Sequence, residues 1–172
     1  GEMSDAAKRG EALFNSERLE CFHCHDGYNF SDATIDRGVT FLEPLFHNTG
    51  LYNIDGMGAY PDPNTGRHEV TGNPDHMGQF RTPSLRNVAV TAPYNHDGSV
   101  PTLEGVIRNY AAGGRVIASG EHAGDGRMNP FKDGVLVSFQ ITDAEVDDLV
   151  AFLESLTDDA FLTDPRFSDP WR

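Results

Sequence analysis

The chain contains one C-x-x-C-H motif, formed by Cys21, Cys24 and His25, and these two cysteines are the only ones it has. Two thiols at this spacing reach both vinyl groups of a porphyrin from one turn, and the following imidazole faces the iron. A redox dithiol would need a βαβ context, and a zinc site would need further cysteines or paired histidines. The sequence offers neither, so the motif predicts one covalently attached haem c with His25 as the proximal ligand.

The composition fits a chain that folds around such a group. Only 38% of the residues are hydrophobic, and the chain holds 18 glycines and 10 prolines. These breakers interrupt residues 27–101 so often that no long regular element fits there. A compact domain rarely keeps so much irregular chain unless it wraps a ligand. We therefore expect a loop-rich domain whose small core is completed by the apolar body of the haem.

Three segments carry helical patterns with recognisable start or stop signals: residues 4–14, 102–112 and 142–156. The last is the clearest, because Thr142 and Glu145 form a capping box ahead of an apolar stripe. A short helical turn is predicted for residues 84–89. The acidic, aromatic tail after Thr157 is predicted to lie along the surface. With no internal repeat or linker in view, residues 1–172 are expected to form a single c-type haem domain.

The charge balance excludes two classes of partner. The chain has 27 acidic and 13 basic residues and a net charge of −14 at pH 7, which repels phosphate backbones and anionic lipids. No stretch approaches the roughly 18 apolar residues of a membrane span. We therefore expect neither nucleic-acid binding nor membrane insertion. Because thioether attachment of haem normally takes place outside the bacterial cytoplasm, we expect a periplasmic or otherwise exported protein.

The segment FRTPSLRNVAVTAPYNHDGS, from Phe80 to Ser99, closely resembles a signature of the bacterial dihaem cytochrome c peroxidases, in their MauG/MbnH-like branch. The first helix, the haem motif and the capped last helix also fit, so the resemblance covers nearly the whole chain. It is confined to the C-terminal haem domain of that family, without the half that carries the peroxide-reacting haem. The resemblance implies an all-α, cytochrome c-like haem domain with long irregular loops.

The resemblance also implies a sixth iron ligand. In the family this ligand lies fourteen residues after the signature histidine, so from His96 it is Tyr110. Classical peroxidases have methionine there, and MauG-like and MbnH-like proteins have tyrosine. Tyr110 follows Leu103, Val106 and Ile107 at helical spacing and so points inward. Spacing alone equally fits a core tyrosine whose hydroxyl finds a hydrogen bond. An anionic phenolate ligand would favour ferric and higher oxidation states.

Two arginines and two backbone carbonyls complete the predicted site. A guanidinium binds a carboxylate in bidentate fashion, so Arg86 and Arg81 are candidates for the haem propionates, with a surface ion pair as the alternative for each. The resemblance implies a calcium ion between two haem domains, held partly by the carbonyls of Thr91 and Pro93, because carbonyl oxygens suit that hard cation. It thereby also implies a second haem domain or subunit as a partner.

Other candidate ligands have simpler interpretations. The loop residues Met57, Met77 and Met128 are competing sixth ligands, although each is also an ordinary packing or surface residue. His96 is expected to line the haem or to hold its loop by hydrogen bonds, without a catalytic role, and His23 fills a variable position of the motif. The remaining histidines are expected to be solvated or hydrogen-bonded in loops; they are His47, His68, His76 and His122.

These observations predict a haem c oxidoreductase that transfers electrons and stores oxidising equivalents through a haem ligated by His25 and Tyr110. A haem with both axial positions filled cannot bind peroxide until one ligand leaves. The isolated chain would then be an electron relay within a dihaem enzyme, serving an electron-donor or substrate protein. Two alternatives stay open: a self-sufficient monohaem peroxidase from which Tyr110 dissociates, and a plain monohaem carrier with a methionine sixth ligand.

Overall fold

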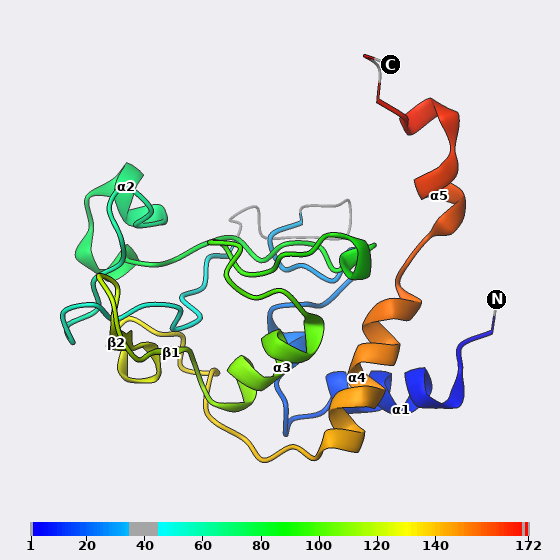
Figure 1. Ribbon diagram of the computed structural model, residues 1–172, viewed down its shortest axis with the longest axis horizontal. Coiled ribbons are helices and arrows are strands. Elements are labelled where there is room, and N and C mark those ends of the chain that lie inside the picture. Colours follow the sequence, from blue (N-terminus) through cyan, green and yellow to red (C-terminus); the bar gives the residue numbers. More distant parts are fainter. Residues whose placement is uncertain (1, 35–44, 170, 172) are drawn as a thin grey trace.

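Short helices joined by long loops make up the computed structural model, which describes residues 2–34, 45–169 and 171 (Figure 1). The α-helices are α1 (Asp5–Phe14), α2 (Arg67–Thr71), α3 (Leu103–Ala111), α4 (Asp143–Ser155) and α5 (Asp159–Thr163). The strands β1 (Val116–Ile117) and β2 (Gly124–Asp125) pair antiparallel. Single 3-10 turns cover Cys21–His23, Pro74–His76, Val88–Val90, Gly126–Met128 and Pro165–Phe167. Within this part of the chain, no helix has the length and apolarity needed to cross a bilayer.

Helices α1 and α4 cross in close contact and frame the helical part of the molecule (Figure 1). Both begin where the sequence predicts: the Ser4 hydroxyl accepts a hydrogen bond from the first turn of α1, and the capping box of Thr142 and Glu145 opens α4. Gly10 allows the two backbones to meet, because a Cβ at this position would lie 2.0 Å from the carbonyl oxygen of Asp148. The crossing therefore depends on a residue without a side chain.

The core fills the space between α1, α3 and α4. The Phe152 side chain of α4 is almost fully buried, and its ring centroid lies 5.1 Å from that of Phe14 and 6.2 Å from that of Phe30. The other buried members of this cluster are Leu19, Val88, Leu103, Ile107, Val146, Leu149 and Leu153. The apolar stripes predicted for α3 and α4 are thus confirmed. Cys21 packs against the same cluster, which sets the haem-attachment motif beside the core.

Buried asparagines hold the irregular loops in place. Asn48 is 1% exposed, and its Oδ1 accepts hydrogen bonds from the backbone N–H of Gly50 and the hydroxyl of Tyr60, both at 2.8 Å. Asn53 and Asn129 are also buried and bind backbone groups of neighbouring loops. These side chains satisfy backbone groups that a helix or strand would otherwise pair internally. A segment rich in glycine and proline therefore keeps one conformation without regular elements.

The signature segment turns later than predicted. The 3-10 turn covers Val88–Val90 instead of residues 84–89, because Asn87 adopts a left-handed conformation (φ 59°) and the turn begins only after it. The sequence also does not predict α2 or the two-residue strands, whose patterns are too short for periodicity to detect.

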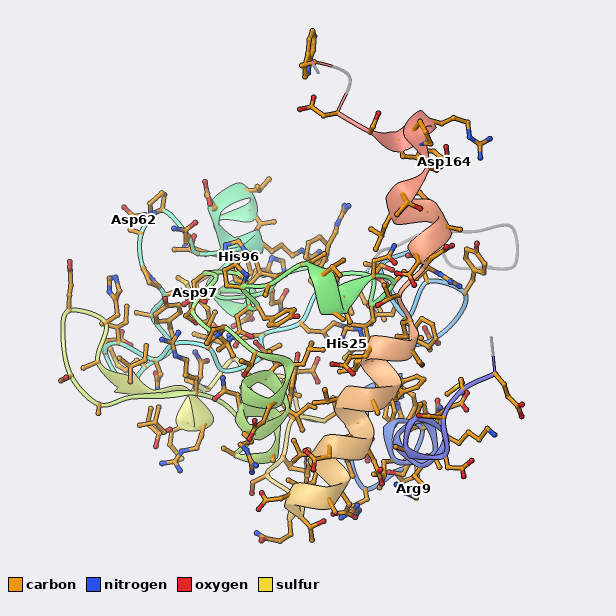
Figure 2. The ribbon with its side chains drawn as sticks, turned by 45° about the vertical axis from the view of Figure 1, so that its right-hand side comes forward. Arg9, His25, Asp62, His96, Asp97 and Asp164 are labelled. Atoms are coloured by element: carbon orange, nitrogen blue, oxygen red, sulfur yellow. The ribbon has the colours of Figure 1, made fainter. Side chains whose placement is uncertain are left out.

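The tail after Thr157 is the second local correction. The predicted surface-hugging segment instead forms a C-terminal arm, residues 158–169, in which α5 and the turn after it project away from the body (Figures 1 and 2). The Phe161 and Phe167 rings stack on each other, with centroids 4.6 Å apart. The arm therefore covers part of its apolar surface by itself.

Candidate haem-binding site

The C-x-x-C-H motif folds as a tight turn. Glu20 adopts a left-handed conformation (φ 59°) ahead of the turn Cys21–His23, and the N–H of His25 donates to the carbonyl of Cys21 at 3.0 Å. The Cys21 and Cys24 thiols are both free and partly buried. Burial raises the pKa of the Cys21 thiol to about 12, so it is protonated at neutral pH. Five consecutive residues thus present two thiols and one imidazole from a single turn.

His25 is held as a neutral imidazole with one nitrogen left for a metal. Its Nδ1 lies 3.0 Å from the carbonyl oxygen of Phe30, and a carbonyl only accepts, so Nδ1–H is the donor. Burial lowers the pKa of His25, which keeps the ring unprotonated at Nε2. Figure 2 places His25 inside the outline of the molecule, far from Asp164 on the C-terminal arm. A fixed Nδ1–H tautomer is the arrangement that metal-ligating histidines commonly have.

Tyr110, on α3, is electrostatically coupled to the attachment thiols. Burial raises the pKa of its phenol well above the ordinary value, and interaction with Cys24 and Cys21 raises it further. Ligation of the iron by Tyr110 stays a prediction. Within the described residues, the Tyr110 hydroxyl makes no hydrogen bond. The phenol is therefore neutral and has no protein partner for its oxygen.

Two residues of the segment Phe80–Ser99, Ser84 and Arg86, bind the loop that orients His25. The Arg86 side chain donates through Nε to the carbonyl of Tyr28 at 3.1 Å, and its guanidinium lies 4.4 Å from the centroid of the Tyr28 ring. The Ser84 hydroxyl donates to the carbonyl of Asn29 at 2.7 Å. Both contacts hold residues that directly precede Phe30, whose carbonyl accepts from His25. Arg86 thus binds a backbone carbonyl and an aromatic ring instead of forming the surface ion pair that was its alternative. Its pairing with a haem propionate stays a prediction.

Arg81 lies on a different surface. Its guanidinium lies 5.3 Å from the centroid of the Phe46 ring, and the residue is exposed. It lines a surface pocket of about 290 Å³ together with Phe80 and His96, whose rings stack at 3.7 Å. Within the described residues His96 makes this ring contact and no hydrogen bond, so its contact differs in kind from the predicted one. The propionate role of Arg81 stays a prediction.

The two residues predicted to bind calcium are exposed. Pro93 forms a cis peptide bond with Ala92, and Thr91 directly precedes Ala92. Within the described residues, the carbonyl oxygens of Thr91 and Pro93 accept no backbone hydrogen bond. This leaves both oxygens available to a cation, and calcium binding stays a prediction.

The methionines and histidines that compete with Tyr110 as the sixth iron ligand are mostly exposed or bound to other groups. Met57 and Met128 are 73% and 71% exposed, and Met77 is partly buried. His68 and His76 make hydrogen bonds in their loops, as predicted for them. His122 contacts the ring of Tyr52, and His23 pairs with Glu20 beside the motif.

His47 is the functional candidate that the sequence interpretation undervalues. Its side chain is only 15% exposed, and both ring nitrogens contact carboxylates, Nδ1 with Asp133 and Nε2 with Asp32. It is thus hydrogen-bonded, as one of the two predicted alternatives states, and is not solvated. The carboxylates lie 15 and 86 residues away in sequence, so no local pattern identifies the cluster.

Comparison with known proteins assigns the family. The cytochrome c family model matches residues 7–157. The chain is 34% identical over 179 residues to cytochrome-c peroxidase IdrP1 of Denitromonas iodatirespirans, covering 97% of this chain and 43% of that protein. It is 32% identical over 157 residues to the methylamine utilization protein MauG of Methylophilus methylotrophus, covering 90% of this chain and 37% of that protein.

Solved structures agree with this assignment. The crystal structure of a MauG-like protein associated with microbial copper homeostasis matches with a TM-score of 0.95 and 53% identity, covering all of this chain and 49% of that one. The dihaem peroxidase BthA of Burkholderia thailandensis, at 22% identity and a TM-score of 0.63, shares the fold. The chain spans half or less of the length of these proteins. The chain therefore belongs to the cytochrome c family, as a half-length homologue of the bacterial cytochrome c peroxidases and MauG.

Proposed function

We propose that this chain is an electron-relay domain in which His25 and Tyr110 ligate the iron of one haem c, so that the haem stores oxidising equivalents. The family supports a haem c oxidoreductase. The proposal that His25 and Tyr110 are the iron ligands, and that the domain is a relay, depends on the donor atoms of the described residues near Cys21 and Cys24.

The donor set fits haem c. Both thiols are free, and His25 is neutral with Nε2 available, as an axial imidazole must be. Cys21 and Cys24 would form the thioethers, and His25 and Tyr110 would occupy the two axial positions. When bound, the haem supplies one-electron redox chemistry at iron.

The hydroxyl of Tyr110 carries the proposal. Three other tyrosines donate from their hydroxyls to protein acceptors: Tyr52 to Asp97, Tyr60 to Asn48 and Tyr94 to Val88. Tyr110 has no such acceptor within the described residues, and neither does Tyr28, which is 73% exposed. A metal partner explains the lone hydroxyl, and its positive charge would lower the phenol pKa enough to form the phenolate.

The protein's part in this function is to fill both axial positions and keep them filled. The Phe30 carbonyl and the clamp from Arg86 hold the proximal imidazole, and α3 holds the phenol. With both residues bound to the iron, peroxide would find no open coordination position there. The chain would then serve a second haem domain or subunit and an electron-donor or substrate protein, in an exported location.

A methionine-ligated carrier is the less favoured alternative. Met57 and Met128 lie largely in solvent, and a thioether ligand needs an apolar, enclosed position to raise the potential. Met77 is partly buried and is the methionine on which this alternative depends.

Replacing the phenol tests this proposal. Tyr110→Phe in the haem-loaded chain is expected to convert the ferric spectrum from low spin to high spin, because the sixth ligand is removed. Tyr60→Phe is the matched control, since it removes a buried hydroxyl that bonds to Asn48. Optical and EPR spectra of both variants are compared with the parent chain. If Tyr110→Phe leaves the ferric spectrum unchanged, Tyr110 is not a ligand.

A further inference from the structure

The cluster of Asp32, His47 and Asp133 is a charged group that the proposed function does not use. His47 Nε2 lies 2.6 Å from Asp32 Oδ2, and Nδ1 lies 2.5 Å from Asp133 Oδ2. Ionised carboxylates only accept hydrogen bonds, so both ring nitrogens act as donors and the ring is an imidazolium. The three side chains then carry a net charge of one negative unit.

This triad is joined directly to the haem-attachment motif. The backbone N–H of Asp32 donates to the carbonyl of Cys24 at 2.9 Å. The Cys24 sulfur lies within 4.8 Å of ligand atoms of both Asp32 and His47. Because the Cys24 sulfur is used in the thioether, these residues are not assigned as a separate metal site. They would instead lie beside the edge of the haem that is bonded to Cys24.

The triad is least solvated at the end that touches the motif. The exposed fraction of the side chain is 7% for Asp32, 15% for His47 and 26% for Asp133. Asp32 Oδ1 is buried and has no hydrogen-bond partner among the described residues. Its negative charge is therefore only partly compensated, by one imidazolium contact to the other oxygen. Charges in poorly solvated surroundings act more strongly on their neighbours than exposed ones do.

We propose that Asp32, His47 and Asp133 form an electrostatic triad whose net negative charge stabilises the ferric haem and keeps its reduction potential low. Reduction adds one electron to the haem, and a fixed negative charge nearby disfavours that step. The triad acts on the haem through space, so its residues are not catalytic. The inference needs only a haem attached at Cys24, and it deepens the proposed storage of oxidising equivalents without depending on the identity of the sixth ligand.

The reduction potential of the haem-loaded chain tests the triad. Asp32→Asn keeps the shape of the side chain and removes its charge, so the potential is expected to rise. The expected size is about tenfold in the equilibrium constant for reduction, as for one unit charge roughly 12 Å from another at an effective dielectric constant of about 20. That factor corresponds to about 59 mV for a one-electron couple. Asp133→Asn is expected to shift the potential in the same direction by less, because Asp133 is more exposed.

Asp164→Asn is the matched control. Asp164 also lies in an ion pair, with Arg166 at 2.6 Å, but it belongs to the C-terminal arm (Figure 2). Its neutralisation is expected to leave the potential unchanged. An unchanged or lowered potential in Asp32→Asn, with the parent haem spectrum retained, would overturn the triad proposal. The ferric spectrum of the same samples reports the sixth ligand independently, so failure of the triad and failure of Tyr110 ligation are distinguishable.

Discussion

Covalent haem is expected to be lost completely when Cys21 and Cys24 are both replaced by alanine. The two thioethers are the only covalent links that the motif offers, and the chain has no other cysteine that could replace them. His25 and Tyr110 could still bind haem, but only reversibly, through coordination bonds. Mass spectrometry of the denatured chain should therefore show the apoprotein mass, and haem staining after denaturing electrophoresis should be absent.

His23→Ala is the control for that experiment. His23 lies inside the motif, but its side chain is 41% exposed and pairs with Glu20 on the outside of the turn. This variant should retain covalent haem at the parental level. Haem that survives denaturation in the double cysteine variant would contradict the attachment assigned to Cys21 and Cys24.

The second large effect is expected at the centre of the core. Phe152→Ala should lower the free energy of unfolding by about 3–5 kcal/mol, because the removed ring leaves a cavity that the rigid helix crossing closes only in part. The ring contacts both Phe14 of α1 and Phe30, the residue that orients His25. A total stability of about 5–15 kcal/mol is usual for a domain, so this loss is a large fraction of it.

Chemical denaturation of the haem-loaded chain, followed by circular dichroism, measures this loss. Phe167→Ala on the C-terminal arm is the matched control, because Phe167 is 58% exposed and its ring contacts Phe161 and Arg166 of the same arm. It should cost less than about 1 kcal/mol. Equal losses in the two variants would contradict the assignment of Phe152 to the core.

Features specified by neighbouring residues could be predicted from the sequence. The helix that begins at Thr142 has its capping box and apolar stripe within fifteen residues, and the structure has both. The C-x-x-C-H turn is equally local. The turn after Asn87 was misplaced because its start depends on a left-handed backbone conformation that asparagine permits without requiring.

Features built from segments that are distant in sequence could not be predicted from the sequence. His47 meets Asp32 and Asp133 only after the loops fold, so its sequence neighbours give no sign of the triad. Tyr110 was identified through the family resemblance, and its helical spacing alone fits a core residue equally well. The direction of the C-terminal arm depends on what its apolar side chains can contact, which composition does not determine.

The most direct test of His25 and Tyr110 ligation is low-temperature EPR of the resting ferric chain, with and without peroxide. Two filled axial positions predict a low-spin signal that peroxide does not change, as an electron relay requires. A high-spin signal that disappears on peroxide addition would contradict this account, because it would show an open iron site and a self-sufficient peroxidase.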